Sequence, residues 1–193
     1  MDRPFRSILV FTVAYFAFFT ALAFVRGNFE FLYYITILLA LLVFIVFYQK
    51  KLHLSIHILA GLSLVGCLHF AGGNLYFGGQ RLYEIYFLPF LRFDNIVHFF
   101  GTITATFVCY NMLRSHLDNI RYDKYILCLI LVIMAMGLGA LNEVLEFGAV
   151  VFLGAAQQVG DYFNNALDLL FNLTGSVIAC FFIHPYHKKQ LKS

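Results

Sequence analysis

Charged residues are scarce in this sequence. Asp, Glu, Lys and Arg make up 12% of the 193 residues, whereas 62% are hydrophobic. A soluble domain carries about 25% charged residues, roughly twice as many. The composition therefore excludes an ordinary soluble domain and predicts a polytopic, all-α membrane protein. A length near 200 residues leaves room for one membrane domain, which we expect to occupy residues 1–193.

Signatures of several common enzymes and metal sites are also missing. The chain contains no G-x-S-x-G, P-loop, H-E-x-x-H or G-x-G-x-x-G motif, which excludes the enzyme classes that these motifs mark. Its four cysteines lie in apolar runs without C-x-x-C spacing, so we interpret them as small buried hydrophobic residues. The net charge of +3 arises from basic residues in loops and the tail, and it does not indicate nucleic-acid binding.

Long apolar runs dominate what is present. A helix needs about 18 to 25 apolar residues to cross roughly 30 Å of hydrocarbon. Six segments meet this requirement, at about 7–25, 31–48, 54–71, 94–113, 125–150 and 165–184. We therefore predict six transmembrane helices.

Lysine and arginine are unevenly distributed between the two sides of this arrangement. Ten of the 13, including Arg121 and Lys192, flank the spans on the side of the termini. Only Arg26, Arg81 and Arg92 lie on the other side. The positive-inside rule predicts that both termini are cytoplasmic and that the connections 72–93 and 151–164 face outwards.

The connection 72–93 is too aromatic for an ordinary hydrophilic loop, and it is not a span. Two Gly-Gly pairs give its backbone freedom, and its Tyr and Phe rings suit the headgroup level of a bilayer. We expect a lid or an interfacial helix on the outer surface, and the alternative is an aromatic anchor without a role in substrate binding.

Polar residues in the spans gather at one predicted depth. Asp94 and His98 share one face near the start of the fourth span, and Glu143 and Glu146 share one face near the outer end of the fifth. Asp161, Asn164, Asp168 and Asn172 form a stripe into the sixth span, and His69 ends the third on the same side. Charged groups in membrane helices usually face the bundle interior or a water-filled cavity. We therefore expect one outer polar cluster.

Three interpretations of this cluster remain open. Carboxylates with imidazole can bind one divalent metal such as zinc, manganese or iron, which would activate water or hold a phosphate. The groups can instead bind a proton, cation or small solute in transit, although no polar stripe continues to the cytoplasmic side apart from His57. Finally, they can hold helices together by hydrogen bonds. Arg81 and Arg92 could neutralise part of the charge in that case.

Four motifs of the chain resemble a known family. The series GG…LY, FDNIVHF, NEVLEF and GDYFNNALDLLFNLTG, over residues 66–179, resembles the YjdF-like family of bacterial inner-membrane proteins and, more distantly, the VanZ-like family. The resemblance implies a bacterial cytoplasmic membrane location. It selects Asp94, His98, Glu143, Glu146, Asp161 and Asp168, followed by Asn172 and Gly175. Asn164 stands where the YjdF-like pattern often has another acid, which favours one metal or none.

The resemblance does not define a reaction. VanZ-like proteins are associated with teicoplanin resistance, which is compatible with action on a lipid or lipid-linked envelope component. We therefore expect a membrane-embedded hydrolase or transferase that can depend on a metal, in contact with membrane lipids; the alternative is a non-enzymatic protein that binds a lipid, ion or small molecule. The expected catalytic residues are Asp94, His98, Glu143, Glu146 and Asp168. The candidate metal ligands are these five and Asp161, with His69 as a second-line member.

Overall fold

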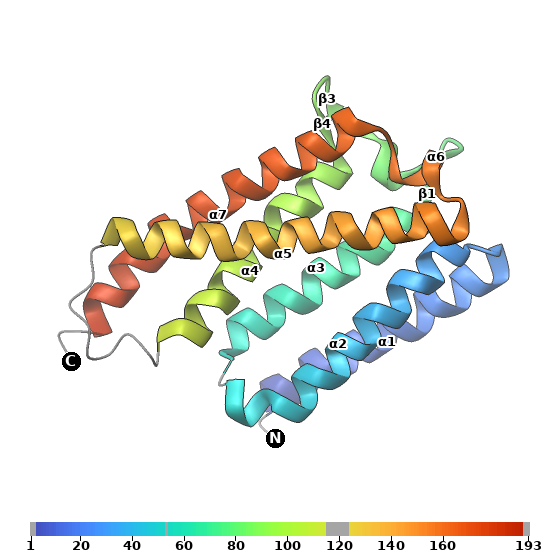
Figure 1. Cartoon of the computed structure of the whole chain (residues 1–193). Helices are drawn as coiled ribbons and strands as arrows, with labels where there is room; N and C mark the ends of the chain where they lie inside the picture. The colour runs from blue at the N-terminus through green and yellow to red at the C-terminus, as the bar shows by residue number, and fades with distance from the viewer. Residues whose placement is uncertain (1–2, 53, 115–123, 191–193) are drawn as a thin grey trace.

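Six long helices run side by side in the computed structural model, which describes residues 3–52, 54–114 and 124–190 (Figure 1). They are α1 (Arg3–Arg26), α2 (Phe29–Leu52), α3 (Ile56–Asn74), α4 (Phe93–Arg114), α5 (Lys124–Leu153) and α7 (Tyr162–Gln190). All six are long and apolar enough to cross a membrane, which confirms the six predicted spans. The predicted orientation stays a prediction, and Arg121 and Lys192, which contributed to it, lie outside the described residues.

Most helices extend beyond the apolar runs that predicted them. For example, α7 continues to Gln190, past Pro185, and α1 begins at Arg3. Hydropathy detects only the part of a helix that suits hydrocarbon, whereas polar residues at either end can keep the helical hydrogen bonds. The third helix instead begins at Ile56, later than expected, because Ser55 caps it by accepting a hydrogen bond from the Ile58 amide.

The helices form two groups that meet at α3 and α4. Rings of Tyr15, Phe16, Phe31 and Phe70 fill the core between α1, α2 and α3. The other group consists of α4, α5 and α7, in which α4 packs along most of α7. A Cβ on Gly175 of α7 would lie 2.5 Å from the backbone oxygen of Phe99, so only glycine permits this approach. The two groups together enclose the polar side chains of α4.

Three glycines of α5 and α7 allow close contacts with neighbouring helices. Gly139, Gly148 and Gly175 each face a neighbouring helix at a distance where a Cβ would collide. Gly137, in contrast, has open space around its Cβ position and is exposed. Positions 137 and 139 differ by about 200° around the helix, so Gly137 and Gly139 cannot both face the same neighbouring helix.

The connection between α3 and α4 forms two small hairpins, so of the lid or interfacial helix that we expected, the interfacial helix is wrong. Strands β1 (Tyr76–Phe77) and β2 (Gln80–Arg81) pair first, a 3-10 turn η1 (Leu82–Glu84) follows, and β3 (Tyr86–Leu88) pairs with β4 (Leu91–Arg92). Gly78 and Gly79 have φ values of 58° and 85°, which suit a two-residue hairpin turn. The other pair, Gly72 and Gly73, belongs to α3 and leaves room for aromatic rings.

The hairpins lie at the end of the bundle opposite the start of α1 and the end of α7 (Figure 1). We call this the hairpin end. Several rings there are about half exposed or more, including Phe77, Tyr86 and Phe90, as expected for an aromatic segment at a membrane surface. The short helix α6 (Ala156–Val159) connects α5 to α7 at the same end.

Candidate functional site

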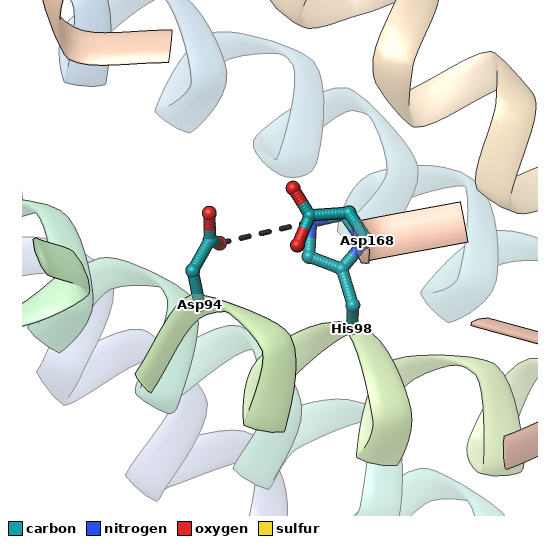
Figure 2. Close-up of side chains that lie close together, drawn as sticks. All are labelled: Asp94, His98 and Asp168. Carbon is teal, nitrogen blue, oxygen red and sulfur yellow. Dashed lines mark ion pairs between the residues drawn. The ribbon is translucent and has the colours of Figure 1, made fainter. Parts of the chain in front are cut away.

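Five ionisable side chains from three helices meet below the hairpin end. Asp94 and His98 come from α4, Glu143 and Glu146 from α5, and Asp168 from α7. We call these five residues the polar cluster. With a rise of 1.5 Å per residue, Asp94 lies in the first turn of its helix and the other four lie about 8 to 15 Å from the ends of theirs. Figure 2 shows Asp94, His98 and Asp168 pointing toward one another.

His98 occupies the centre of the polar cluster. Its Nε2 lies 3.7 Å from Asp94 Oδ1, 3.9 Å from Asp168 Oδ1 and 4.0 Å from Glu146 Oε1. Its other ring nitrogen, Nδ1, lies 3.8 Å from Glu143 Oε1. A hydrogen bond between such atoms would measure about 2.7 to 3.2 Å. The carboxylates therefore surround the imidazole without closing direct hydrogen bonds to it.

Three asparagines fix two of these carboxylates. Asn95 Nδ2 donates to Asp168 Oδ1 at 2.8 Å, and Asn164 Nδ2 donates to Asp168 Oδ2 at 2.9 Å. Asn142 Nδ2 donates to Glu146 Oε1 at 2.7 Å. Both oxygens of Asp168 thus act as acceptors. These amides hold the acids in orientations that face His98.

Glu143 differs from the two acids just described. Both of its carboxylate oxygens are buried, and neither has a hydrogen-bond partner among the described residues. A buried polar atom without a partner is costly, and it needs a specific explanation. Its Oε1 lies 3.8 Å from His98 Nδ1, which is too far for a hydrogen bond.

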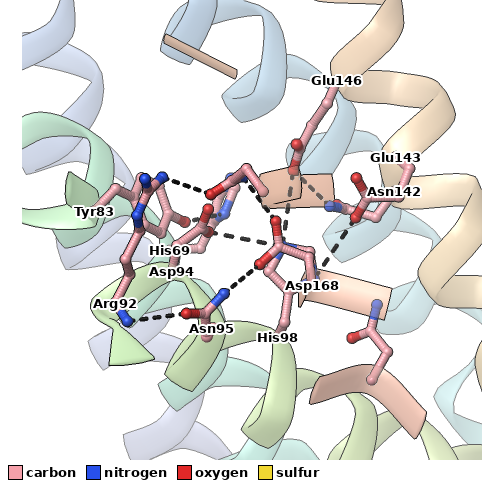
Figure 3. Close-up of polar contacts among 12 residues, drawn as sticks. His69, Tyr83, Arg92, Asp94, Asn95, His98, Asn142, Glu143, Glu146 and Asp168 are labelled. Carbon is pink, nitrogen blue, oxygen red and sulfur yellow. Dashed lines mark hydrogen bonds and ion pairs between the residues drawn. The ribbon is translucent and has the colours of Figure 1, made fainter. Parts of the chain in front are cut away.

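Neither Arg81 nor Arg92 pairs with the polar cluster. The backbone N–H of Arg92 donates to Asn95 Oδ1 at 2.9 Å (Figure 3). Its guanidinium donates to Asn164 Oδ1 at 2.6 Å and lies over the Tyr86 ring. Arg81 pairs with Glu30 of α2 at 2.6 Å, where both side chains are buried. Within the described residues, the ion pairs of the polar cluster all involve His98. Four carboxyl groups therefore share one imidazole.

His69 lies beside the polar cluster. Its Nδ1 is 2.5 Å from the hydroxyl of Tyr83, a residue of the turn η1 that covers this end of the bundle. Burial, reinforced by the nearby Asp94 and Glu146 carboxylates, raises the pKa of Tyr83 well above its usual value. The phenol thus keeps its proton and can donate it to His69. A Cβ on Gly72 would lie 2.6 Å from the Tyr83 ring, so that glycine admits the ring.

Asp161 is not brought together with the polar cluster. It is exposed and directly precedes α7. Its Oδ1 accepts a hydrogen bond from the backbone N–H of Asn164 at 3.0 Å. This geometry is that of a helix N-cap. Asp161 therefore stabilises the start of the helix that carries Asp168.

Two overlapping sets of side chains are spaced closely enough to hold a metal ion. They are Asp94 with His98 and Asp168, and His98 with Glu143 and Glu146, and within each set one ligand atom per residue lies within 4.8 Å of the others. Carboxylate oxygens with imidazole nitrogen suit zinc, manganese or iron. Sequence reasoning had named these residues, but it missed the amides of Asn95 and Asn142. The sequence offers one signal for them: Asn95 directly follows Asp94, and Asn142 directly precedes Glu143.

Comparison with known proteins identifies a family but no function. No curated protein matches this chain, and no solved structure matches it. The family described as "Predicted membrane protein (DUF2238)" matches residues 7–189, nearly the whole chain. This match agrees with the resemblance to the YjdF-like family, whereas the more distant link to the VanZ-like family finds no support. The chain therefore belongs to the DUF2238 family of predicted membrane proteins.

Proposed function

We propose that the polar cluster binds one divalent metal ion, and that the metal centre catalyses hydrolysis or group transfer on a lipid or lipid-linked envelope substrate. The observation that carries the proposal is the charge balance: four carboxyl groups face one imidazole, at distances too long for hydrogen bonds. Uncompensated charge at this depth is expensive in a membrane protein. A divalent cation of the zinc, manganese or iron type would supply the missing positive charge.

The two nitrogens of His98 suggest different roles for the surrounding acids. Nε2 faces Asp94 and Asp168, at 3.7 and 3.9 Å, and these two acids would share the ion with it. Glu146, at 4.0 Å from the same nitrogen, would stay free to accept a proton. Nδ1 faces Glu143 instead. Metal-binding histidines usually donate their second N–H to a carboxylate or carbonyl, which fixes the ring and its tautomer. Glu143 would take this role, which explains why its oxygens are buried without another donor.

A divalent ion in such a centre can activate water and can hold a phosphate or carbonyl oxygen. The chain's own groups would do the rest. Asn95 and Asn164 keep Asp168 aimed at the centre, and Asn142 holds Glu146, the acid best placed to accept a proton from the attacking water. Because the hairpin end carries exposed rings suited to a membrane surface, a substrate in the lipid phase is favoured.

We further propose that the protein resides in a bacterial cytoplasmic membrane with the hairpin end outside. The distribution of Lys and Arg supports this orientation. Transport of an ion is less favoured, because the cavity that leads from the polar cluster toward the termini is lined mainly by apolar side chains such as Leu41, Leu59 and Ile45. An ion would have no polar path there.

Replacing Glu143 with glutamine tests whether the polar cluster is a binding site or a structural element. In metal-free protein, the variant should be more stable by about 0.5 to 2 kcal/mol, because it removes an acid that faces other acids and whose buried oxygens have no hydrogen-bond partner among the described residues. A structural ion pair would give the opposite sign, with a loss of about 3 to 5 kcal/mol. Thermal unfolding in detergent with a chelator measures the difference.

The exposed acid Glu84 offers the matched control for this experiment. Glu84→Gln changes the net charge equally but should leave stability within about 0.5 kcal/mol of the wild type. A stability loss in Glu143→Gln alone would contradict the proposed metal site.

A further inference from the structure

A cavity of about 310 Å³ extends from the polar cluster into the middle of the bundle. His98 and Asn142 line one end of the cavity. Phe5, near the start of α1, and Val46, near the end of α2, line the other end. On α2 the lining residues run from Tyr34 to Val46, a distance of about 18 Å along a helix. The cavity is therefore elongated, and it runs parallel to the helices.

The walls of this cavity are mainly apolar, and the hydroxyls of Thr12 and Ser63 in its middle hydrogen-bond to each other. Leu, Ile, Val and Phe side chains of α1, α2 and α3 supply the largest share of the lining. Two of the lining residues, Leu41 of α2 and Leu138 of α5, are 47% and 45% exposed, so the cavity reaches the lipid-facing surface between these helices. A hydrocarbon chain can enter from the bilayer there without crossing water.

Two buried hydrogen-bond donors on the cavity wall have no acceptor among the described residues. They are the Tyr34 hydroxyl and Asn172 Nδ2. Only 7% of the surface of Tyr34 and 2% of that of Asn172 is exposed. Asn172 is held in place because its Oδ1 accepts from Thr102 at 2.5 Å and because Gly139 leaves space beside its Nδ2. Buried donors of this kind require a partner, such as an oxygen atom of a ligand.

We propose that the cavity binds one acyl chain of a membrane phospholipid, with an oxygen of the lipid's polar end accepting hydrogen bonds from Tyr34 and Asn172. The volume lies at the lower end of the range for ligand cavities, about 300 to 1,000 Å³, so it suits one chain and not a whole lipid. The second chain would remain in the bilayer, beyond Leu41 and Leu138. This inference rests on the proposed function, because it places the substrate's polar end beside the metal centre.

Photolabelling tests the proposal directly. The full-length protein is reconstituted in liposomes that contain phosphatidylglycerol with a diazirine on one acyl chain, and labelled peptides are identified by mass spectrometry. Ala105 of α4 lines the cavity, so Ala105→Phe should fill it and lower labelling of α3 and α4 peptides by about tenfold. The matched control is Ala140→Phe, on an exposed position of α5, which should label like the wild type.

A second variant keeps the test valid if Ala105→Phe does not fold. Tyr34→Phe removes only the unpartnered hydroxyl, and it should reduce labelling severalfold with no loss of thermal stability. Metal content is measured on the same samples. Bound metal with equal labelling of wild type, Ala105→Phe and Tyr34→Phe would overturn this inference and leave the proposed function standing. Labelling that falls in both variants, in protein that binds no metal, would support the lipid-binding cavity and overturn the proposed metal-dependent function.

Discussion

Replacing Asp94 with asparagine is expected to lower the affinity for a divalent metal by at least about 100-fold. Even loss of a residue that only supports a metal ligand typically costs about 10 to 100-fold. Asp94 makes the shortest of the approaches to His98, at 3.7 Å, and it faces Nε2, the nitrogen that we assign to the metal. Zinc or manganese binding, measured by elemental analysis after dialysis at graded free-metal concentrations, gives the affinity.

Asp161 provides the matched control for this substitution. It is an acid at the same end of the bundle, but it caps α7 and does not belong to the polar cluster. Asn caps a helix about as well as Asp, so Asp161→Asn should keep both the fold and the metal. Equal metal affinity in Asp94→Asn and Asp161→Asn would contradict the assignment of Asp94 as a ligand.

Loss of Arg81 is expected to cost about 3 to 5 kcal/mol of stability, because it leaves Glu30 buried and unpaired. The two side chains meet at 2.6 Å, and only 5% and 9% of their surfaces are exposed. Burial acts to lower the pKa of Arg81, but the bond to Glu30 outweighs it and raises that pKa above its usual value. The guanidinium thus stays charged. Thermal unfolding of Arg81→Met in detergent measures the loss.

The same pair allows a double substitution as control. Arg81→Met combined with Glu30→Gln leaves no unpaired charge, so it should recover most of the lost stability. Arg81 also lies over the Phe31 ring, at 5.2 Å, and this contact would not be recovered. An Arg81→Met variant as stable as the wild type would show that the ion pair does not anchor the first hairpin to α2.

The sequence predicts the depth of the polar cluster better than its internal arrangement. Spacings of three and four residues, with a rise of 1.5 Å per residue, place Asp94, His98 and Glu143 at one level without any structure. The same arithmetic cannot decide which acids face one another, because that depends on how each helix is rotated in the bundle. Asp161 and Asp168 show this limit: they are seven residues apart, yet Asp161 precedes the helix and Asp168 is fully buried.

The partners of the two arginines could not be predicted either. Both Arg81 and Arg92 lie near the cluster in sequence terms, and either could have neutralised it. Pairing of Arg81 with Glu30 depends on the first hairpin folding against α2, a contact between residues 51 positions apart. The hairpin itself has one signal in the sequence, Gly78-Gly79. Its two-residue strands are too short to show the alternation by which strands are recognised.

Binding of a metal ion by the polar cluster is the central claim, and anomalous diffraction from crystals of the zinc-loaded protein tests it most directly. We predict one anomalous peak beside His98 Nε2, at about 2.0 to 2.2 Å from that nitrogen and from carboxylate oxygens of Asp94 and Asp168. A cluster without such a peak, in which His98 hydrogen-bonds directly to the carboxylates, would contradict the claim.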